Sequence, residues 1–454
     1  MSRWGSDDLF YYSQVAGNLS HGLGLTFDGD TPTNGFQPLY LALLVPFGRA
    51  LHNDPVLATY IVLGLVTVLS LLAAWQLVLL GEEAEVPTFG WAAAVVWLVH
   101  PKLLSVTFNG TEAALTMLVL VLALRACIWV HRDGETRAAS LIFACLVLCR
   151  LDLGVFLLIV GAALARSGCS ARAWFALFTP AVAVMGALLA FNLLQFGHAL
   201  PDSGVAKGLH AAVLQEVGLA PPWDAFAAQV GRALGKAEGA TAWSVWVPAL
   251  MGGVVTLRRR VLRRGVGLLL VGGVAVVCAD FVRVGGFREW YLMPLYLALV
   301  ITTSAVIEAL WQRGPALRVV AVALLIVWWQ AAAAHPRQHM APSYLRAAAA
   351  VRETWPAGIR IGAFNSGLYG AALGDTYQVI NLDGVVNHEV LPYLRTRRLD
   401  TYLRSKRIDA LLDHRGTLRF FGRFAAMPLA SSGTSDIQVG TDKSAGILGI
   451  YLDY

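Results

Sequence analysis

Two adjacent carboxylates near the N-terminus are the residues whose types and spacing best suit catalysis. Asp7 and Asp8 precede the aromatic run 10–12, and a polar, glycine-rich stretch continues to Pro38. Repulsion between neighbouring carboxylates raises the pKa of one while water keeps the other ionised, so such a pair can supply a general base. The alternative is that both residues cap the start of a helix and lie in water.

The composition indicates an integral membrane protein. Of 454 residues, 57% are hydrophobic and only 14% charged, and the mean hydropathy is +0.61, whereas soluble domains carry about 25% charged residues. The polar segment Ser6–Pro38 must therefore lie outside the hydrocarbon, where its polar groups find partners. The net charge of +6 does not indicate nucleic-acid binding, because the basic residues lie in short loops between apolar segments and form no aromatic-interleaved patch.

The apolar segments predict about ten transmembrane helices. A short apolar stretch at 38–51 is expected to lie on the membrane surface, since about 20 apolar residues are needed to cross a bilayer. The predicted spans are 56–80, 89–106, 111–131, 138–150, 153–166, 174–196, 241–256, 265–281, 290–311 and 317–334. Four of the five loops on one side are basic, which places that side in the cytoplasm and Asp7 and Asp8 outside.

The composition changes at residue 335, where no further span is predicted. Strands are expected at 359–364, 378–382, 408–413 and 447–452, and a helix at 391–407. The predicted fold is thus a polytopic α-helical membrane protein with a small C-terminal extracytoplasmic α/β domain. We expect a transmembrane module at 1–334, with its first outer loop at 1–55, and a soluble domain at 335–454.

The N-terminal motif has a family resemblance. The pattern DD-x-F-Y-Y-x-x-x-A-x-N-L, followed by T-N-G-F-Q-P-L, resembles the first extracytoplasmic loop of the GT-C superfamily, and is closest to bacterial arabinofuranosyl- and mannosyltransferase-like members. These membrane glycosyltransferases use polyprenyl-phosphate sugars as donors. The resemblance implies that Asp7 or Asp8 deprotonates the acceptor, with Asn34 and Gln37 of the same loop in supporting roles.

A second landmark of the family lies at 191–207. FNLLQFGHALPDSGVAK resembles the pattern N-x-x-x-F/Y-G-x-x-x-P-x-x-x-x-x-K, which implies that Lys207 binds the donor phosphate. His198 would be a hydrogen-bonding neighbour. Without the pattern, Lys207 reads equally as a lysine that extends its amine to the membrane interface.

Three further polar elements are predicted on the outer side. Arg150-Leu-Asp152 resembles the family's R-x-D, and Asn109–Glu112 its G-x-E element. Arg150 and Arg288 are additional phosphate-binding candidates, and Glu112, Asp152 and Tyr291 are supporting residues. The alternatives are an internal ion pair at Arg150, a helix cap at Glu112 and an interfacial aromatic belt around Tyr291.

No metal or other cofactor is predicted. The five cysteines lie in or beside apolar segments, and no Cys/His group has zinc spacing. In the C-terminal part, Asn381–Asn387 resembles a recurring element of bacterial members, and its Asp-Gly pair is expected in a tight turn. Glycan binding there is a hypothesis, and no catalytic role is assigned to it.

Together these features predict an inverting, metal-independent glycosyltransferase of the bacterial inner (plasma) membrane. It would move a sugar from a polyprenyl-phosphate donor to a glycan, lipid or protein acceptor on the extracytoplasmic face. The alternatives are a transporter or flippase of a lipid-linked or anionic solute, which should carry charged or broken segments at mid-membrane, and a non-catalytic glycan-binding protein. No transmembrane segment precedes Asp7, although the family has one there, so we expect the natural start to lie upstream.

Overall fold

The computed structural model divides the chain into two compact units, described separately below. It describes residues 6–216, 260–284, 288–334, 341–425, 436–438 and 447–451. Unit 1 comprises residues 1–64, 189–219 and 337–454, and unit 2 comprises 65–188 and 220–336. The contacts thus group the N-terminal residues and residues 189–219 with the C-terminal residues, whereas the sequence suggested a single boundary after residue 334.

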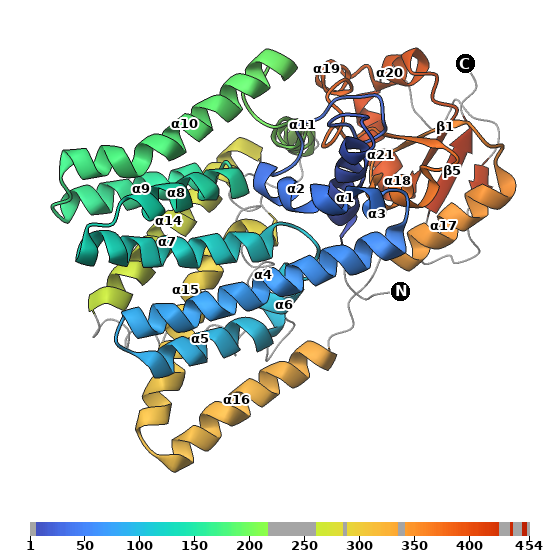
Figure 1. Cartoon of the computed structure of the whole chain (residues 1–454). Coiled ribbons are helices and arrows are strands. Elements are labelled where there is room, and N and C mark those ends of the chain that lie inside the picture. The colour runs from blue at the N-terminus through green and yellow to red at the C-terminus, as the bar shows by residue number, and fades with distance from the viewer. Residues whose placement is uncertain are drawn as a thin grey trace. The chain divides into compact units, whose positions relative to one another are not determined.

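Unit 2 is helical (Figure 1). Its helices, two of which begin or end in unit 1, are α4 (Pro55–Glu83), α5 (Pro87–Val99), α6 (Pro101–Thr107), α7 (Ala113–Asp133), α8 (Arg137–Cys149), α9 (Leu153–Arg166), α10 (Ala171–Phe196), α14 (Arg260–Val284), η2 (Glu289–Leu292), α15 (Met293–Gln312) and α16 (Pro315–Ala334). Among the described residues, five helices are long and apolar enough to cross a membrane, or six if α5 and α6 form one span bent by 64°. The bend falls at His100-Pro101, because proline lacks an N–H and forces the preceding residue out of the helical region.

Nine of the ten predicted spans coincide in position with these helices, but not all of the nine are long. α8 and α9 have only 13 and 14 residues, and they flank Arg150–Asp152 as the predicted hairpin. The predicted span at 241–256 lies outside the described residues. Among the long helices, α15 is the most enclosed and contacts α5, α7 and α14.

Small residues and outward apolar side chains fit unit 2 to a lipid environment. α4 and α5 approach so closely that a Cβ on Gly90 would lie 2.7 Å from the Val78 carbonyl oxygen, as is common where membrane helices pack through glycine. Large apolar side chains remain exposed on the outer helices, among them Trp75, Leu158 and Phe175. In water such a surface would be unfavourable, whereas acyl chains can cover it.

Unit 1 contains a five-stranded sheet, orange to red in Figure 1. Its strands are β1 (Arg360–Ala363), β2 (Gln378–Asn381), β3 (Ala410–His414), β4 (Asp436–Gln438) and β5 (Ile447–Tyr451), in the order β2-β1-β3-β5-β4. β1 runs parallel to β2 and β3, and β5 runs antiparallel to β3 and β4. The carboxyl ends of the three parallel strands therefore share one edge, where ligands commonly bind in α/β folds.

Short helices surround this sheet. They are α17 (Ala341–Thr354), α18 (Gly367–Leu373), α19 (Leu391–Arg395), α20 (Leu399–Ser405), α21 (Arg415–Phe421) and η3 (Gly422–Phe424). The single helix predicted at 391–407 is wrong, because the chain breaks at Arg397, whose φ is +56°, into α19 and α20. A left-handed residue cannot continue a right-handed helix.

The N-terminal part of unit 1 is built around α1 (Asp7–Ser20), whose residues from Leu9 to Asn18 are all buried. Its polar side chains find partners, for example Asn18, whose amide donates to the Thr26 and Phe27 carbonyls. The predicted surface helix at 38–51 forms as three short elements, α2 (Pro38–Leu44), η1 (Val45–Phe47) and α3 (Gly48–Leu51), and α11 (Asp202–Glu216) lies in the same unit. α1 contacts both α3 and α18.

Candidate functional site

Asp7 fixes the start of α1 to the β1–α18 turn in unit 1. Its carboxylate accepts the backbone N–H of Gly367 at 3.1 Å and that of Leu368 at 2.9 Å, so it caps α18 rather than its own helix. Burial raises the pKa of Asp7 to about 6, although the two N–H groups oppose this and the charge of Asp8 adds to it. One residue of the predicted pair thus has a structural role.

Tyr11, one turn further along α1, strengthens the same junction. Its hydroxyl donates to the Phe364 carbonyl and accepts the Ser366 N–H, at 3.2 and 3.3 Å. Its ring packs edge-on against Phe27 with centroids 5.5 Å apart. The first two turns of α1 are therefore held at the carboxyl end of β1.

Asp8 differs from Asp7 in its contacts. Within the described parts of the chain, no side chain or backbone N–H hydrogen-bonds to the Asp8 carboxylate. The residue is partly exposed in the first turn of α1. Asp8 is therefore the carboxylate of the pair that can accept a proton without breaking a hydrogen bond.

Asp383 is a third carboxylate of unit 1, and the sequence analysis assigned no catalytic role to it. It follows β2, and its Oδ1 accepts the Val385 N–H at 2.8 Å. Burial raises its pKa to about 7, opposed by that bond and by Asn381, and the charges of Asp7 and Asp8 raise it further. The signal in the sequence was the Asp-Gly pair at the end of a strand, which also has the commoner meaning of a turn.

α11 brings Lys207 into unit 1 beside this segment. Ala206 and Val213 on α11 belong to the core that α19, α20 and α21 also form, and the His210 Nε2–H donates to the Asp383 carbonyl at 2.9 Å. Lys207 precedes His210 by three residues, so the two residues are neighbours on the helix surface. The predicted Lys207 thus belongs to the helix that is anchored to the Asp383 segment.

The other predicted residues of the first loop are structural in their contacts. The Asn34 amide donates to Asn192 Oδ1 at 2.8 Å, and its Oδ1 accepts the Asp202 N–H at 2.7 Å. Gln37 precedes α2, and its N–H donates to the Tyr12 hydroxyl at 3.2 Å. Both residues shape the loop that follows α1.

In unit 2, Arg150 is enclosed by acidic partners. Its guanidinium donates to Glu112 at 2.6 Å and to both carboxylate oxygens of Asp152 at 3.1 and 2.5 Å. It also lies over the Tyr291 ring, 4.0 Å from the centroid. The sequence left open whether Arg150 forms an internal ion pair or binds phosphate, and the geometry favours the ion pair, because two carboxylates already surround the cation.

The remaining predicted residues of unit 2 lie near η2. Glu289 pairs with Lys102 at 2.7 Å, while Arg288 is exposed just before η2. Glu112 precedes α7 but makes no side-chain cap bond there. Its contact with Arg150 supports a role in orienting that guanidinium rather than in capping the helix. A phosphate-binding role for Arg288 stays a prediction.

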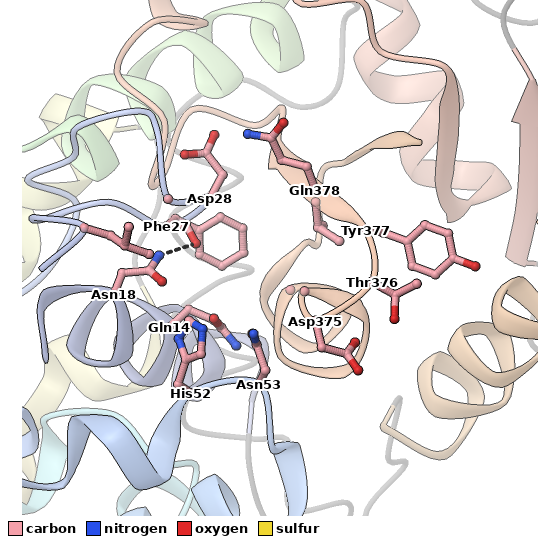
Figure 2. Close-up of a pocket in the computed structure, with 15 residues that line it drawn as sticks. Gln14, Asn18, Phe27, Asp28, His52, Asn53, Asp375, Thr376, Tyr377 and Gln378 are labelled. Atoms are coloured by element: carbon pink, nitrogen blue, oxygen red, sulfur yellow. Dashed lines mark hydrogen bonds between the residues drawn. The ribbon is translucent and has the colours of Figure 1, made fainter. Parts of the chain in front are cut away.

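A polar pocket of about 330 Å³ lies in unit 1. Figure 2 shows residues of α1 and of the α3–α4 turn on one side and residues 375–378 on another. Gln14 is 3% exposed, and its Nε2 has no hydrogen-bond partner among the residues that the structure describes. His52 also lines the pocket, and its Nδ1 likewise has no hydrogen-bond partner in the described part of the chain. A pocket bordered by amides, carboxylates and an aromatic ring suits a polyhydroxylated ligand.

The described part of the chain is mostly helical, with five helices long and apolar enough to cross a membrane. No family model and no curated protein sequence matches the chain. Among solved structures, ArnT from Cupriavidus metallidurans bound to undecaprenyl phosphate is similar, with a TM-score of 0.60 at 10% identity over 99% of this chain and 94% of that one.

An archaeal relative in fold is the oligosaccharyltransferase AglB from Archaeoglobus fulgidus. Its apo form gives a TM-score of 0.55 at 12% identity over 96% of this chain and 69% of that one. A complex with an inhibitory peptide and a dolichol-phosphate gives 0.52 at 11% identity. The predicted resemblance to the GT-C superfamily is thereby confirmed at the level of the fold.

Proposed function

We propose that this protein is a glycosyltransferase that moves a sugar from a polyprenyl-phosphate donor to an acceptor. The observation that carries the proposal is the fold shared with an undecaprenyl-phosphate-bound ArnT along nearly the whole of both chains. The carboxylate pair of the first outer loop supports it, since the reaction needs a base outside the hydrocarbon. The protein would act at the extracytoplasmic face of a bacterial plasma membrane, with about ten spans and residues 335–454 outside.

Asp8 is the general base in this proposal. Its carboxylate takes the proton of the acceptor hydroxyl as the hydroxyl oxygen bonds to the anomeric carbon of the donor sugar. The bond from that carbon to the phosphate oxygen breaks, and the polyprenyl phosphate leaves with the electron pair. Because this is a single displacement, the anomeric configuration inverts. Asp7 is a positioning residue, since both of its oxygens hold α18.

Lys207 would bind the departing phosphate, and the first experiment combines its variant with a donor screen. The full-length protein in nanodiscs is assayed with polyprenyl-phosphate sugars that differ in the sugar. We expect transfer from one donor, and a loss of about 10- to 100-fold in Lys207→Ala, because a hydrogen bond to a charged group contributes about 1.5–3 kcal/mol. Lys207→Arg should retain more activity than Lys207→Ala.

The outcomes of this screen separate the candidate functions. Transfer that is unaffected by Lys207→Ala would leave the class intact and remove Lys207 from the site. No transfer from any donor by folded protein would contradict the proposed function and favour transport of a lipid-linked solute, or glycan binding without catalysis. A transporter would move the lipid between the leaflets of vesicles that contain the protein, whereas a glycan-binding protein would not.

The polar pocket of Figure 2 would hold part of a carbohydrate acceptor. Gln14 follows Asp8 by six residues on α1, which is about 9 Å along the helix axis, so an acceptor of several sugars could reach from the pocket to the base. Gln14→Ala should raise the KM for the acceptor by about 2- to 10-fold, because one neutral hydrogen bond is lost, and leave the donor KM unchanged. Gln195→Ala, an exposed glutamine on α10, is the control. An unchanged acceptor KM in Gln14→Ala would exclude the pocket from acceptor binding.

A further inference from the structure

Three side chains from two segments of unit 1 converge on one point. His198 lies between α10 and α11, Asp202 is the first residue of α11, and His388 lies between β2 and α19. One ligand atom from each residue lies within 4.8 Å of the other two. His198 Nε2 and His388 Nδ1 are 3.2 and 3.4 Å from Asp202 Oδ1.

The three converging atoms are buried and form no hydrogen bond within the described ranges of the chain. Neither His198 Nε2, Asp202 Oδ1 nor His388 Nδ1 has a hydrogen-bond partner among the described residues. Asp202 itself is fully buried. Buried polar atoms nearly always have a partner, and three orphaned atoms that face one another indicate a shared ligand.

The second nitrogen of His198 determines which form this ring takes. Its Nδ1 lies 2.6 Å from the Leu200 carbonyl oxygen, and since a carbonyl only accepts, Nδ1 must carry the proton. A neutral ring then has a free lone pair at Nε2, the atom that lies 3.2 Å from Asp202 Oδ1. A backbone carbonyl that fixes the tautomer in this way is typical of metal-binding histidines.

Asp202 is held by its other oxygen. Oδ2 accepts the Thr33 hydroxyl and the Asn34 N–H, both at 3.1 Å. The Asp202 N–H in turn donates to the Asn34 side chain. These contacts orient the carboxylate so that Oδ1 faces the two imidazoles, as outer-shell partners do for a carboxylate that binds a metal.

We propose that His198, Asp202 and His388 bind a divalent metal ion, with Zn²⁺ as the best fit. Two imidazoles and one carboxylate form a donor set that zinc accepts. A tetrahedral ion with ligand bonds of about 2.1 Å sets its ligand atoms about 3.4 Å apart, close to the two distances seen here. Water would take the fourth position. The ion would join the first loop, through Thr33 and Asn34, to the start of α11 and to the C-terminal domain.

An ion pair between Asp202 and protonated histidines explains the geometry less well. It would require the imidazole nitrogens to donate to Oδ1, and neither contact has hydrogen-bond geometry. It would also place two cationic rings with centroids 5.5 Å apart in a region where Phe196 packs against His388. A metal ion avoids this repulsion because both rings stay neutral.

Metal content of the full-length protein tests the proposal without substrate. Protein in nanodiscs is stripped with a chelator, titrated with Zn²⁺ and with Co²⁺, and its bound metal is measured by mass spectrometry. We expect one Zn²⁺ ion per chain, a higher Tm with zinc, and the intense visible absorption of tetrahedral Co²⁺. His388→Ala and Asp202→Asn should abolish stoichiometric binding, and Thr33→Val should weaken it about 10- to 100-fold.

The controls distinguish loss of the ligand from loss of the fold. Asp202→Asn keeps the shape of the side chain and one oxygen that can accept from Thr33 and Asn34. His131→Ala removes an exposed histidine of α7 and should leave metal binding unchanged. A wild-type protein that takes up no stoichiometric metal, or stoichiometric binding that persists in folded His388→Ala, would overturn the proposal. Neither result bears on glycosyl transfer, because no donor is present.

Discussion

Asp8→Asn is expected to reduce sugar transfer by about 10²- to 10⁴-fold, the usual contribution of a general base, while the protein folds as the wild type does. The expectation of normal folding comes from the contacts of Asp8, which accepts no hydrogen bond from the described residues. The substitution is nearly isosteric and removes only the proton-accepting function. The rate of single-turnover transfer from the donor found in the screen is the measurement, with Tm as the check on folding.

Asp7→Asn is the matched control, and it is expected to affect stability more than the transfer rate. The variant keeps one acceptor for the two N–H groups of the β1–α18 turn and loses the other, so its Tm should fall more than that of Asp8→Asn. Its transfer rate should fall less. If Asp7→Asn abolishes transfer at an unchanged Tm and Asp8→Asn does not, the roles of the two residues are reversed.

The pH dependence of stability provides a second distinction. Asp7 has a pKa of about 6 in the folded chain against 3.8 when unperturbed, so between these values the folded state binds more protons than the unfolded state. Stability should therefore fall as the pH rises from about 4 to 6. Asp7→Asn removes this contribution, and the difference in Tm between wild type and variant should change over that window.

The sequence predicted the helical membrane architecture because hydrophobic length reports directly on a span. It also placed strands close to β1, β2, β3 and β5, where short apolar runs end in Gly, Asn or Asp. The prediction of one helix over 391–407 was wrong, because the helical pattern continues through Arg397 and no neighbouring residue indicates the left-handed φ of Arg397. The sequence also did not indicate the division into units, since tertiary contacts assign 189–219 to unit 1.

The sequence likewise predicted the part of the candidate site formed by adjacent residues, but not the part that depends on contacts between distant ones. Asp7 and Asp8 are recognisable because they are adjacent, but their unequal roles depend on the N–H groups of Gly367 and Leu368, which lie far along the chain. The His198–Asp202–His388 group has no zinc spacing, because its third member, His388, lies far along the chain from the other two. A spacing rule detects sites within one local motif, and this group exists only once the segments of unit 1 have packed together.

Arg150→Met is expected to lower the free energy of unfolding by about 3–5 kcal/mol, since it leaves buried carboxylates without their cation. The side chains of Glu112 and Asp152 are only 4% and 10% exposed. If Arg150 instead bound the donor phosphate, as the family resemblance implies, Arg150→Met would mainly raise the donor KM. The geometry predicts loss of stability, because one guanidinium between two carboxylates leaves a net negative charge that disfavours phosphate.

Neutralising the partners tests this assignment directly. Adding Glu112→Gln and Asp152→Asn to Arg150→Met removes the uncompensated charges, so the triple variant should regain part of the lost stability, an interaction that only coupled residues show. The control is Arg132→Ala, which breaks an ion pair with Asp133 whose side chains are 59% and 47% exposed, and should leave Tm unchanged. Thermal unfolding in nanodiscs measures all of these. A triple variant no more stable than Arg150→Met would show that the buried charges are not what Arg150 stabilises. A raised donor KM in Arg150→Met at an unchanged Tm would show instead that Arg150 binds the donor phosphate.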